Sequence, residues 1–273
     1  MGGEVPSMRL LPLMLLAATL AAQDPVDLRG WMNRGVQEFK AAHYQEAVAA
    51  FERAAAIDPS NVPAQLYLGT AYMQQFIPGA EAPENLRVAQ AAQTHFQRVL
   101  EFEPSNNVAL ASMGSLLLNQ KKWDEAQQWY EKLIAVEPQN ADAYYSMGFI
   151  AWSRWYPEYG KARAALGMKQ EDPGPIKDKK VKEELKQKFG PIIDGGLQAL
   201  DKALQINPEY DDAMAYENLL VREKADLADT KEDYEKQTKV ADDWVQKALA
   251  TKKMKAEKKN KTGGGIVADP NAK

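Results

Sequence analysis

The chain has 273 residues, of which 45% are hydrophobic and 26% are charged, with a formal net charge of -4 at pH 7. This balance is ordinary for a folded, soluble protein and excludes a polytopic membrane protein, while the slight acidity gives no reason to expect nucleic acid. The absence of Cys excludes disulfides and thiolate metal sites, and the presence of only two His disfavours a His-based metal or catalytic centre.

The first residues carry the features of a secretory signal. A largely apolar run of eleven residues follows Arg9 and ends at Leu20. It is too short to span a bilayer as a helix, which takes about 20 residues. Small residues at Thr19 and Ala21 match the positions that a signal peptidase reads. We therefore predict a signal peptide over residues 1–21, cleaved after Ala21, and export to the periplasm or outside the cell; an uncleaved membrane anchor is the alternative.

The interior of the chain repeats a short phrase: an apolar or aromatic residue, then an acid or Asn, then a proline. The prolines are Pro59, Pro104, Pro138 and Pro208. Each phrase closes a stretch whose small and large apolar residues share one helical face, and the proline ends that helix. Upstream of each lies a second amphipathic stretch with a glycine where two helices would cross closely. The glycines are Gly35, Gly69, Gly114 and Gly148. The pattern predicts a succession of packed helix pairs.

This pattern resembles the tetratricopeptide repeat, in which 34 residues form two antiparallel helices. The likeness is closest in residues 107–140, which carry Gly114 and Tyr130 at the spacing of that repeat. Residues 28–61 also fit, although Arg34 replaces the usual Leu. Several imperfect copies agree, which makes the resemblance specific.

The resemblance implies an all-α fold, a tetratricopeptide-repeat α-solenoid of about five helix pairs over residues 28–250. The repeats are predicted at about 28–61, 62–106, 107–140, 141–210 and 211–249. The closing prolines stand 45, 34 and 70 residues apart, so the second repeat carries an eleven-residue insertion and the fourth a long one at about 154–190. A further repeat ending near Pro173 is the alternative interpretation of the 70-residue spacing.

A polar helix is expected to end the array, as solenoids need in order to cover their last apolar face. Residues 251–273 hold seven Lys against two acidic residues, which leaves the rest of the chain acidic. We predict a Lys-rich helix end and a disordered tail from Thr262 onward. These lysines could contact anionic lipid or a cell-wall polymer. Because no aromatic residues interleave with them, a solvated helix end is preferred and no nucleic acid is expected.

Few residues offer chemistry. His43 and His95 each lack a second His or a paired carboxylate at ligand spacing. The glycines of residues 263–265 have no strand before them and no helix after them, so they form no phosphate-binding loop. We therefore expect no catalytic residue, no metal site and no cofactor, and interpret the protein as non-enzymatic.

The resemblance also implies a binding surface. In tetratricopeptide arrays the first helices line a concave groove, where residues two, five, nine and twelve of each repeat point inward and partner peptides dock. Chaperone-binding relatives carry Lys and Asn where Met32 and Val36 stand here, so the clamp for a terminal carboxylate is missing. We expect partners with apolar or aromatic side chains. The predicted groove residues are Met32, Val36, Phe39, Leu66, Met73, Leu118, Tyr145, Phe149 and Trp152.

These features predict a protein–protein interaction scaffold of the cell envelope with unidentified protein or peptide partners. One alternative is a small molecule, lipid or glycan in an aromatic pocket around Trp152 and Trp155, under the insertion at 154–176. Another is an accessory subunit of an envelope enzyme complex. The insertion could also lie over Tyr145, Phe149 and Trp152 and occupy the groove itself. The sequence does not define the oligomeric state.

Overall fold

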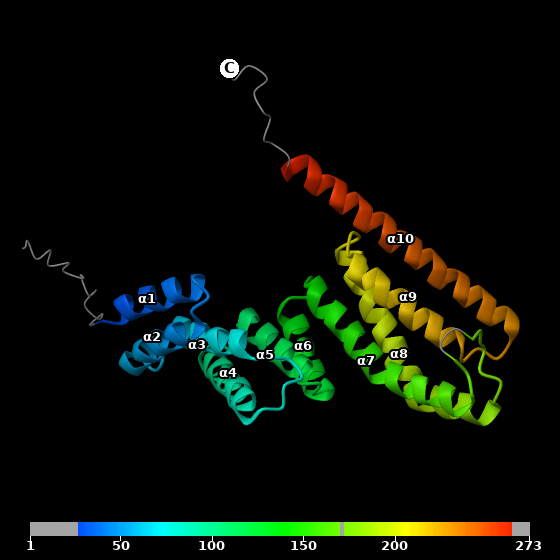
Figure 1. Cartoon of the computed structure of the whole chain (residues 1–273), viewed down its shortest axis with the longest axis horizontal. Coiled ribbons are helices and arrows are strands. Elements are labelled where there is room, and N and C mark those ends of the chain that lie inside the picture. The colour runs from blue at the N-terminus through cyan, green and yellow to red at the C-terminus, as the bar shows by residue number, and fades with distance from the viewer. Residues whose placement is uncertain (1–26, 170–171, 264–273) are drawn as a thin grey trace, which may run out of the picture.

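The computed structural model describes residues 27–169 and 172–263, and this part of the chain forms ten helices and no strand. The helices are α1 (Leu28–Lys40), α2 (Tyr44–Ile57), α3 (Val62–Gln75), α4 (Pro83–Phe102), α5 (Asn107–Asn119), α6 (Trp123–Val136), α7 (Ala141–Ala165), α8 (Lys179–Ile206), α9 (Asp211–Ala225) and α10 (Lys231–Gly263). Consecutive helices pack against each other, and the five pairs stack from α1–α2 at one end to α9–α10 at the other (Figure 1). The predicted all-α solenoid of five helix pairs is confirmed.

Two sequence predictions concern residues beyond this range. The signal peptide at 1–21 lies outside the described residues, and so does the tail from residue 264 onward. Within the described part, none of the helices is both long and apolar enough to cross a membrane.

Asparagine side chains begin three of the first helices. Asn61, Asn106 and Asn140 each accept a hydrogen bond from the backbone N–H three residues later, at 2.9–3.0 Å between nitrogen and oxygen. This bond satisfies one of the N–H groups that the first turn of a helix leaves without a partner. Each Asn follows a closing proline by two residues. The same short phrase therefore ends one helix pair and starts the next.

Glycines let the two helices of a pair approach closely. A Cβ atom added to Gly35 would lie 2.4 Å from Cε1 of Phe51, and one added to Gly148 would lie 2.4 Å from Cγ of Leu200. Both distances are far below van der Waals contact, so the ring and the leucine occupy space that only a glycine leaves open. The crowded positions predicted for these glycines are confirmed.

The long insertion of the fourth pair is mostly helical. It continues α7 to Ala165 and begins α8 at Lys179, so only residues 166–178 form a loop. Pro157 and Pro191 lie inside these two helices. Residues 141–165 form one helix, and the described residues between Ala165 and Pro173 add no second one, so the alternative of an extra repeat ending at Pro173 is not realised.

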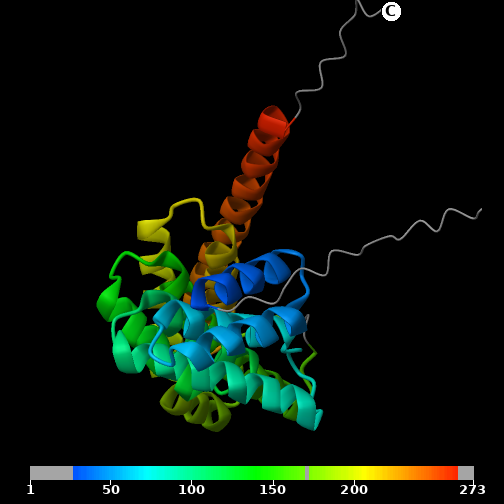
Figure 2. The same cartoon turned by 90° about the vertical axis from the view of Figure 1, so that its left-hand side faces the viewer.

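The last helix is the longest, at 33 residues. Its C-terminal end projects away from the other helices (Figures 1 and 2). It continues to Gly263, past Thr262, where the sequence predicted the tail to begin. The prediction of disorder is therefore wrong for residues 262 and 263.

Candidate binding face

The nine predicted groove residues all lie on first helices of the pairs. Three are on α1, two on α3, one on α5 and three on α7, and every one is half-buried. We call the surface formed by the first helices α1, α3, α5, α7 and α9 the inner face. Each of the nine side chains leaves part of its apolar surface to solvent, which costs free energy until another surface covers it.

The N-terminal part of the inner face is mainly aliphatic. Its side chains are partly buried and pack against the hydrophobic clusters that join successive helix pairs, so these clusters fix their positions. They are Met32, Val36 and Phe39 on α1, Leu66 and Met73 on α3, and Leu118 on α5.

The C-terminal part of the inner face is aromatic. The ring of Tyr216 on α9 lies 5.7 Å from that of Tyr145, 5.3 Å from that of Phe149 and 5.3 Å from that of Trp152, all on α7. Edge-to-face contacts of this kind add to the stabilisation from burial. The structure therefore brings three of the predicted residues together, with a partner from the next repeat. We call six residues the aromatic patch: Tyr145, Phe149, Trp152, Tyr156, Tyr210 and Tyr216.

Three residues of this patch were missed from the sequence. Tyr156 stacks on Trp152 at 4.8 Å, one helical turn further along α7, and the spacing of four residues could have revealed it. Tyr216 is the sixth residue of its repeat, one beyond an inward position. Tyr210 precedes α9 and stacks on Tyr145 at 5.0 Å. No local signal marks these last two, because their contacts cross from one repeat to another.

A buried carboxyl lies beneath the patch. The indole N–H of Trp152 donates a hydrogen bond to Oε1 of Glu223 at 3.1 Å, and Glu223 is only 5% exposed. Burial raises the pKa of Glu223 to about 8, although the hydrogen bond from Trp152 lowers it in part.

Trp155, the next tryptophan, is fully buried in the core and presents no surface to a ligand. Trp155 therefore does not line a ligand pocket, and binding of a small molecule, lipid or glycan at Trp152 stays a prediction.

The loop of the insertion lies at the far end of α7. It starts after Ala165, 20 residues from Tyr145, which corresponds to about 30 Å along a helix. Its described backbone contacts lead to the end of α9 and the start of α10: Ile176 N–H donates to the carbonyl oxygen of Asp226 at 2.8 Å, and Gly174 N–H to the hydroxyl of Tyr234 at 3.0 Å. The loop therefore does not cover Tyr145, and the hypothesis that the insertion occupies this part of the groove is wrong.

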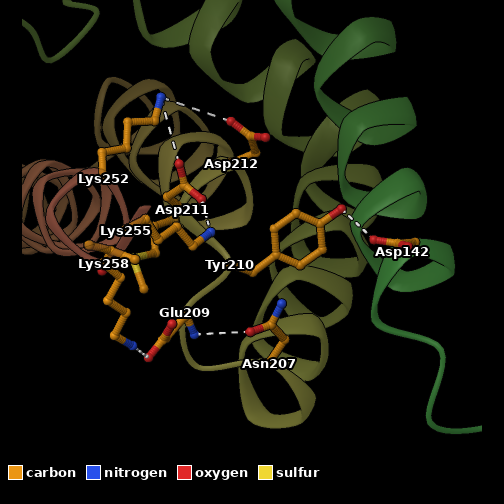
Figure 3. A network of polar contacts seen from close by, with 11 residues as sticks. Asp142, Asn207, Glu209, Tyr210, Asp211, Asp212, Lys252, Lys255 and Lys258 are labelled. Carbon is orange, nitrogen blue, oxygen red and sulfur yellow. Dashed lines mark hydrogen bonds and ion pairs between the residues drawn. The ribbon is translucent and has the colours of Figure 1, made fainter. Parts of the chain in front are cut away.

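Lysines of the terminal helix pair with acids at the start of the fifth repeat (Figure 3). Lys255 forms an ion pair with Asp211, and Nζ of Lys258 lies 2.9 Å from an oxygen of Glu209. Lys252 lies further off, 4.0 Å from Asp211 and 3.9 Å from Asp212. The Lys-rich helix end thus contacts the acidic body of its own chain.

The two histidines have local partners. Nδ1 of His43 lies 3.0 Å from a carboxylate oxygen of Glu38, and Nδ1 of His95 lies 2.8 Å from the amide oxygen of Gln65. Residues 27–169 and 172–263 contain no group of three or more His, Asp or Glu arranged to hold a metal ion.

Stacked helix pairs, close-packed glycines and a half-buried apolar face on the first helices define an α-solenoid of the kind that presents interaction surfaces. Its units are tetratricopeptide repeats. Residues 28–61 match the family model described as "Tetratricopeptide repeat", and residues 114–153 match the one described as "TPR repeat". The chain therefore contains tetratricopeptide repeats in these two segments.

A relative of known identity supports this assignment. The chain is 28% identical over 127 residues to the human (Homo sapiens) mitochondrial import receptor subunit TOM70. The aligned residues make up 46% of this chain and 20% of that protein. The chain thus matches about a fifth of the length of this curated relative.

Solved structures share the fold. The structure of residues 41 to the end of MamA from Desulfovibrio magneticus RS-1 matches with a TM-score of 0.57 and 18% identity, covering 85% of this chain and 98% of that one. Another crystal structure of MamA matches with a TM-score of 0.56 and 18% identity, covering 84% of this chain and 94% of that one. At this identity the likeness shows the fold alone.

Proposed function

We propose that this protein is a non-enzymatic scaffold of the cell envelope that binds segments of partner proteins along its inner face. The observation that carries the proposal is the set of half-buried apolar side chains on the first helices α1, α3, α5 and α7. Apolar area that stays half in water is stabilised when a partner covers it, at about 25 cal/mol per Å².

The chemistry of the face agrees with binding rather than catalysis. The predicted residues carry no nucleophile with an adjacent base, and both histidines are engaged by neighbouring polar side chains. The aliphatic and aromatic side chains of this face supply shape and apolar area, which is what recognition of a peptide segment needs.

Site-specific crosslinking tests the inner face. A photoreactive amino acid at Leu118, on the inner face of α5, should capture a partner in an envelope fraction, whereas the same group at Leu86 of α4, which is 53% exposed, should not. The captured protein is then purified and its affinity measured for Met73→Glu and Leu86→Glu. Met73→Glu should weaken binding by about tenfold or more, because a carboxylate must then lose water in an apolar contact. Equal crosslinking at the two positions, or equal affinity of the two variants, would contradict the proposal.

Location is tested separately. The motif around Ala21 supports removal of residues 1–21, so the chain isolated from its native cells should have Ala22 at its amino terminus. Intact-mass measurement on envelope and cytosolic fractions reads this out. Detection of the full-length chain in the cytosolic fraction would contradict the proposed envelope location but would not contradict the proposed scaffold role.

A further inference from the structure

The aromatic patch differs from the rest of the inner face in carrying exposed acids at its border. Asp142 and Asp212 are each the second residue of their helix, α7 and α9, and both are exposed. That position is one of the inward positions of the repeat. The two carboxylates therefore lie at one end of the aromatic patch, where they act on Tyr145, Tyr210 and Tyr216.

Asp142 has no positively charged neighbour in the described part of the chain. One of its oxygens accepts a hydrogen bond from the hydroxyl of Tyr210 at 2.7 Å (Figure 3), and no Lys or Arg forms an ion pair with it there. A phenol hydroxyl orients the carboxylate but does not neutralise its charge. Asp142 thus presents a negative charge at the edge of the rings that no ion pair neutralises and that only the N-terminal dipole of α7 offsets in part.

Asp212 is compensated only weakly. Its side chain is 61% exposed, and its ion-pair partner among the described residues, Lys252, lies 3.9 Å away and is itself 56% exposed. Exposed pairs at this distance contribute little and are easily exchanged. The inward-position arginine of the same helix, Arg222, forms an ion pair with Asp242 instead. The positive charge of Arg222 is therefore paired with Asp242 and not with Asp212.

The hydroxyls of the patch respond to this negative charge. Burial, followed by the neighbouring Tyr216 and then Asp212, raises the pKa of Tyr145 to about 12. Burial and then Asp212 also raise the pKa of Tyr216, and burial and then Asp142 raise that of Tyr210. Burial is the larger cause and opposes any charge, whereas the smaller contributions of Asp142 and Asp212 disfavour anions and favour cations.

We propose that the aromatic patch binds a basic segment of a partner protein, with an Arg or Lys side chain laid against the rings and its charge paired with Asp142 and Asp212. Aromatic faces attract cations, and a guanidinium both stacks on rings and donates to carboxylates. The proposal rests on the proposed function and narrows it: the aliphatic N-terminal part of the inner face takes apolar side chains, and the patch takes the charged one.

An array of short apolar peptides that differ only in one central residue tests this. The central residue is Arg in one set and citrulline in the second, which keeps the shape and loses the charge; a third set carries Glu. The purified full chain should bind the Arg set about tenfold more tightly than the citrulline set, and the Glu set should bind least. Raising the salt concentration should weaken binding of the Arg peptides and leave that of the citrulline peptides nearly unchanged.

Variants connect the preference to the patch. The double variant Asp142→Asn with Asp212→Asn keeps the side-chain shapes, and should bring the Arg and citrulline affinities within about twofold of each other. Asp243→Asn, which removes an exposed carboxylate of α10, is the matched control and should leave the tenfold difference in place. Circular dichroism checks that each variant is folded.

Two results would overturn the inference. Equal affinity for the Arg and citrulline peptides would show that the patch recognises apolar shape and not charge. This result would reject a basic occupant but would not contradict the scaffold role. Absence of binding by every peptide set would also reject a basic occupant. The crosslinking at Leu118 reports on the scaffold role itself, so the two proposals fail separately.

Discussion

The guanidinium of Arg163 and the carboxylate of Asp226 form an ion pair in which each side chain is only 5% exposed. The pair joins the end of α7 to the residue that follows α9. The same carboxylate accepts a hydrogen bond from the hydroxyl of Tyr159 at 2.7 Å, and Arg163 also donates to the carbonyl oxygens of Lys169 and Asp172 at 2.7 and 2.6 Å. One buried cation thus holds the insertion loop and the last repeat together.

Removing one partner of this pair should be strongly destabilising. Asp226→Ala leaves the Arg163 charge buried without a counter-ion, and we expect a loss of about 3–5 kcal/mol in the free energy of unfolding. Urea denaturation followed by circular dichroism measures it. The control Glu84→Gln breaks the ion pair of Glu84 with Arg87, whose side chains are 72% and 75% exposed, respectively. This variant should lose less than about 1 kcal/mol in the free energy of unfolding. Similar losses in both variants would show that the Arg163 pair is not buried in solution.

Stability should fall as the pH rises through the titration of Glu217. Burial, with a smaller contribution from Asp201, raises the pKa of Glu217 from its ordinary 4.5 to about 8. Between these values the folded chain holds a proton that the unfolded chain releases. The stabilisation linked to this proton is therefore complete below pH 4.5 and is lost as the pH rises through about 8.

Glu217→Gln tests that dependence because glutamine keeps the shape and cannot ionise. At pH 9 the variant should exceed the parent in free energy of unfolding by about 1–3 kcal/mol, with the difference shrinking toward pH 5. Denaturation curves across this range measure it, and Glu232→Gln, at an exposed carboxyl of α10, is the control. A constant difference between Glu217→Gln and the parent at all pH values would refute an ionisation linked to folding.

Two glycines of neighbouring helices should respond oppositely to alanine. Gly148→Ala places a Cβ 2.4 Å from Cγ of Leu200, so the pair must separate, and we expect a loss of about 1–3 kcal/mol. Gly190→Ala in α8 meets no atom within 4 Å and should raise stability by about 0.5–1 kcal/mol, because alanine is the better helix former. Thermal unfolding of both variants gives the two signs; a gain for Gly148→Ala would contradict the close crossing of α7 and α8.

The end of α10 should loosen when its lysines lose their charge. Lys255→Gln removes the ion pair with Asp211, and backbone amides beyond residue 250 should exchange with deuterium several-fold faster as the last turns open. Because the pair lies near the surface, global stability should change by less than about 1 kcal/mol. Hydrogen exchange read by mass spectrometry separates the two effects. Lys253→Gln, at an exposed position, is the matched control; equal acceleration in both variants would rule out a docking role for Lys255.

Local sequence signals carried much of the fold. The proline phrases and crowded glycines predicted four of the five helix pairs, because breaking a helix and letting two backbones approach depend on residues close in sequence. The same regularity placed Tyr145, Phe149 and Trp152 on one face of α7. Whether a partner uses that face stays a prediction.

The insertion and the last repeat were less predictable. Pro157 and Pro191 lie inside helices, because packing against neighbouring helices outweighs the loss of one backbone hydrogen bond. The pairing of Arg163 with Asp226 joins residues 63 positions apart, and no period in the sequence reports on such a contact.

The sequence alone determined that this protein is a stack of helix pairs with an apolar inner face, since helix periodicity and close-packed glycines are properties of short segments. Only the tertiary structure decided which residues complete that face. Tyr216, Asp212 and Glu223 reach the aromatic patch because α9 packs beside α7, and the energy of burying rings and charges depends on neighbours that lie about 70 residues away in the chain.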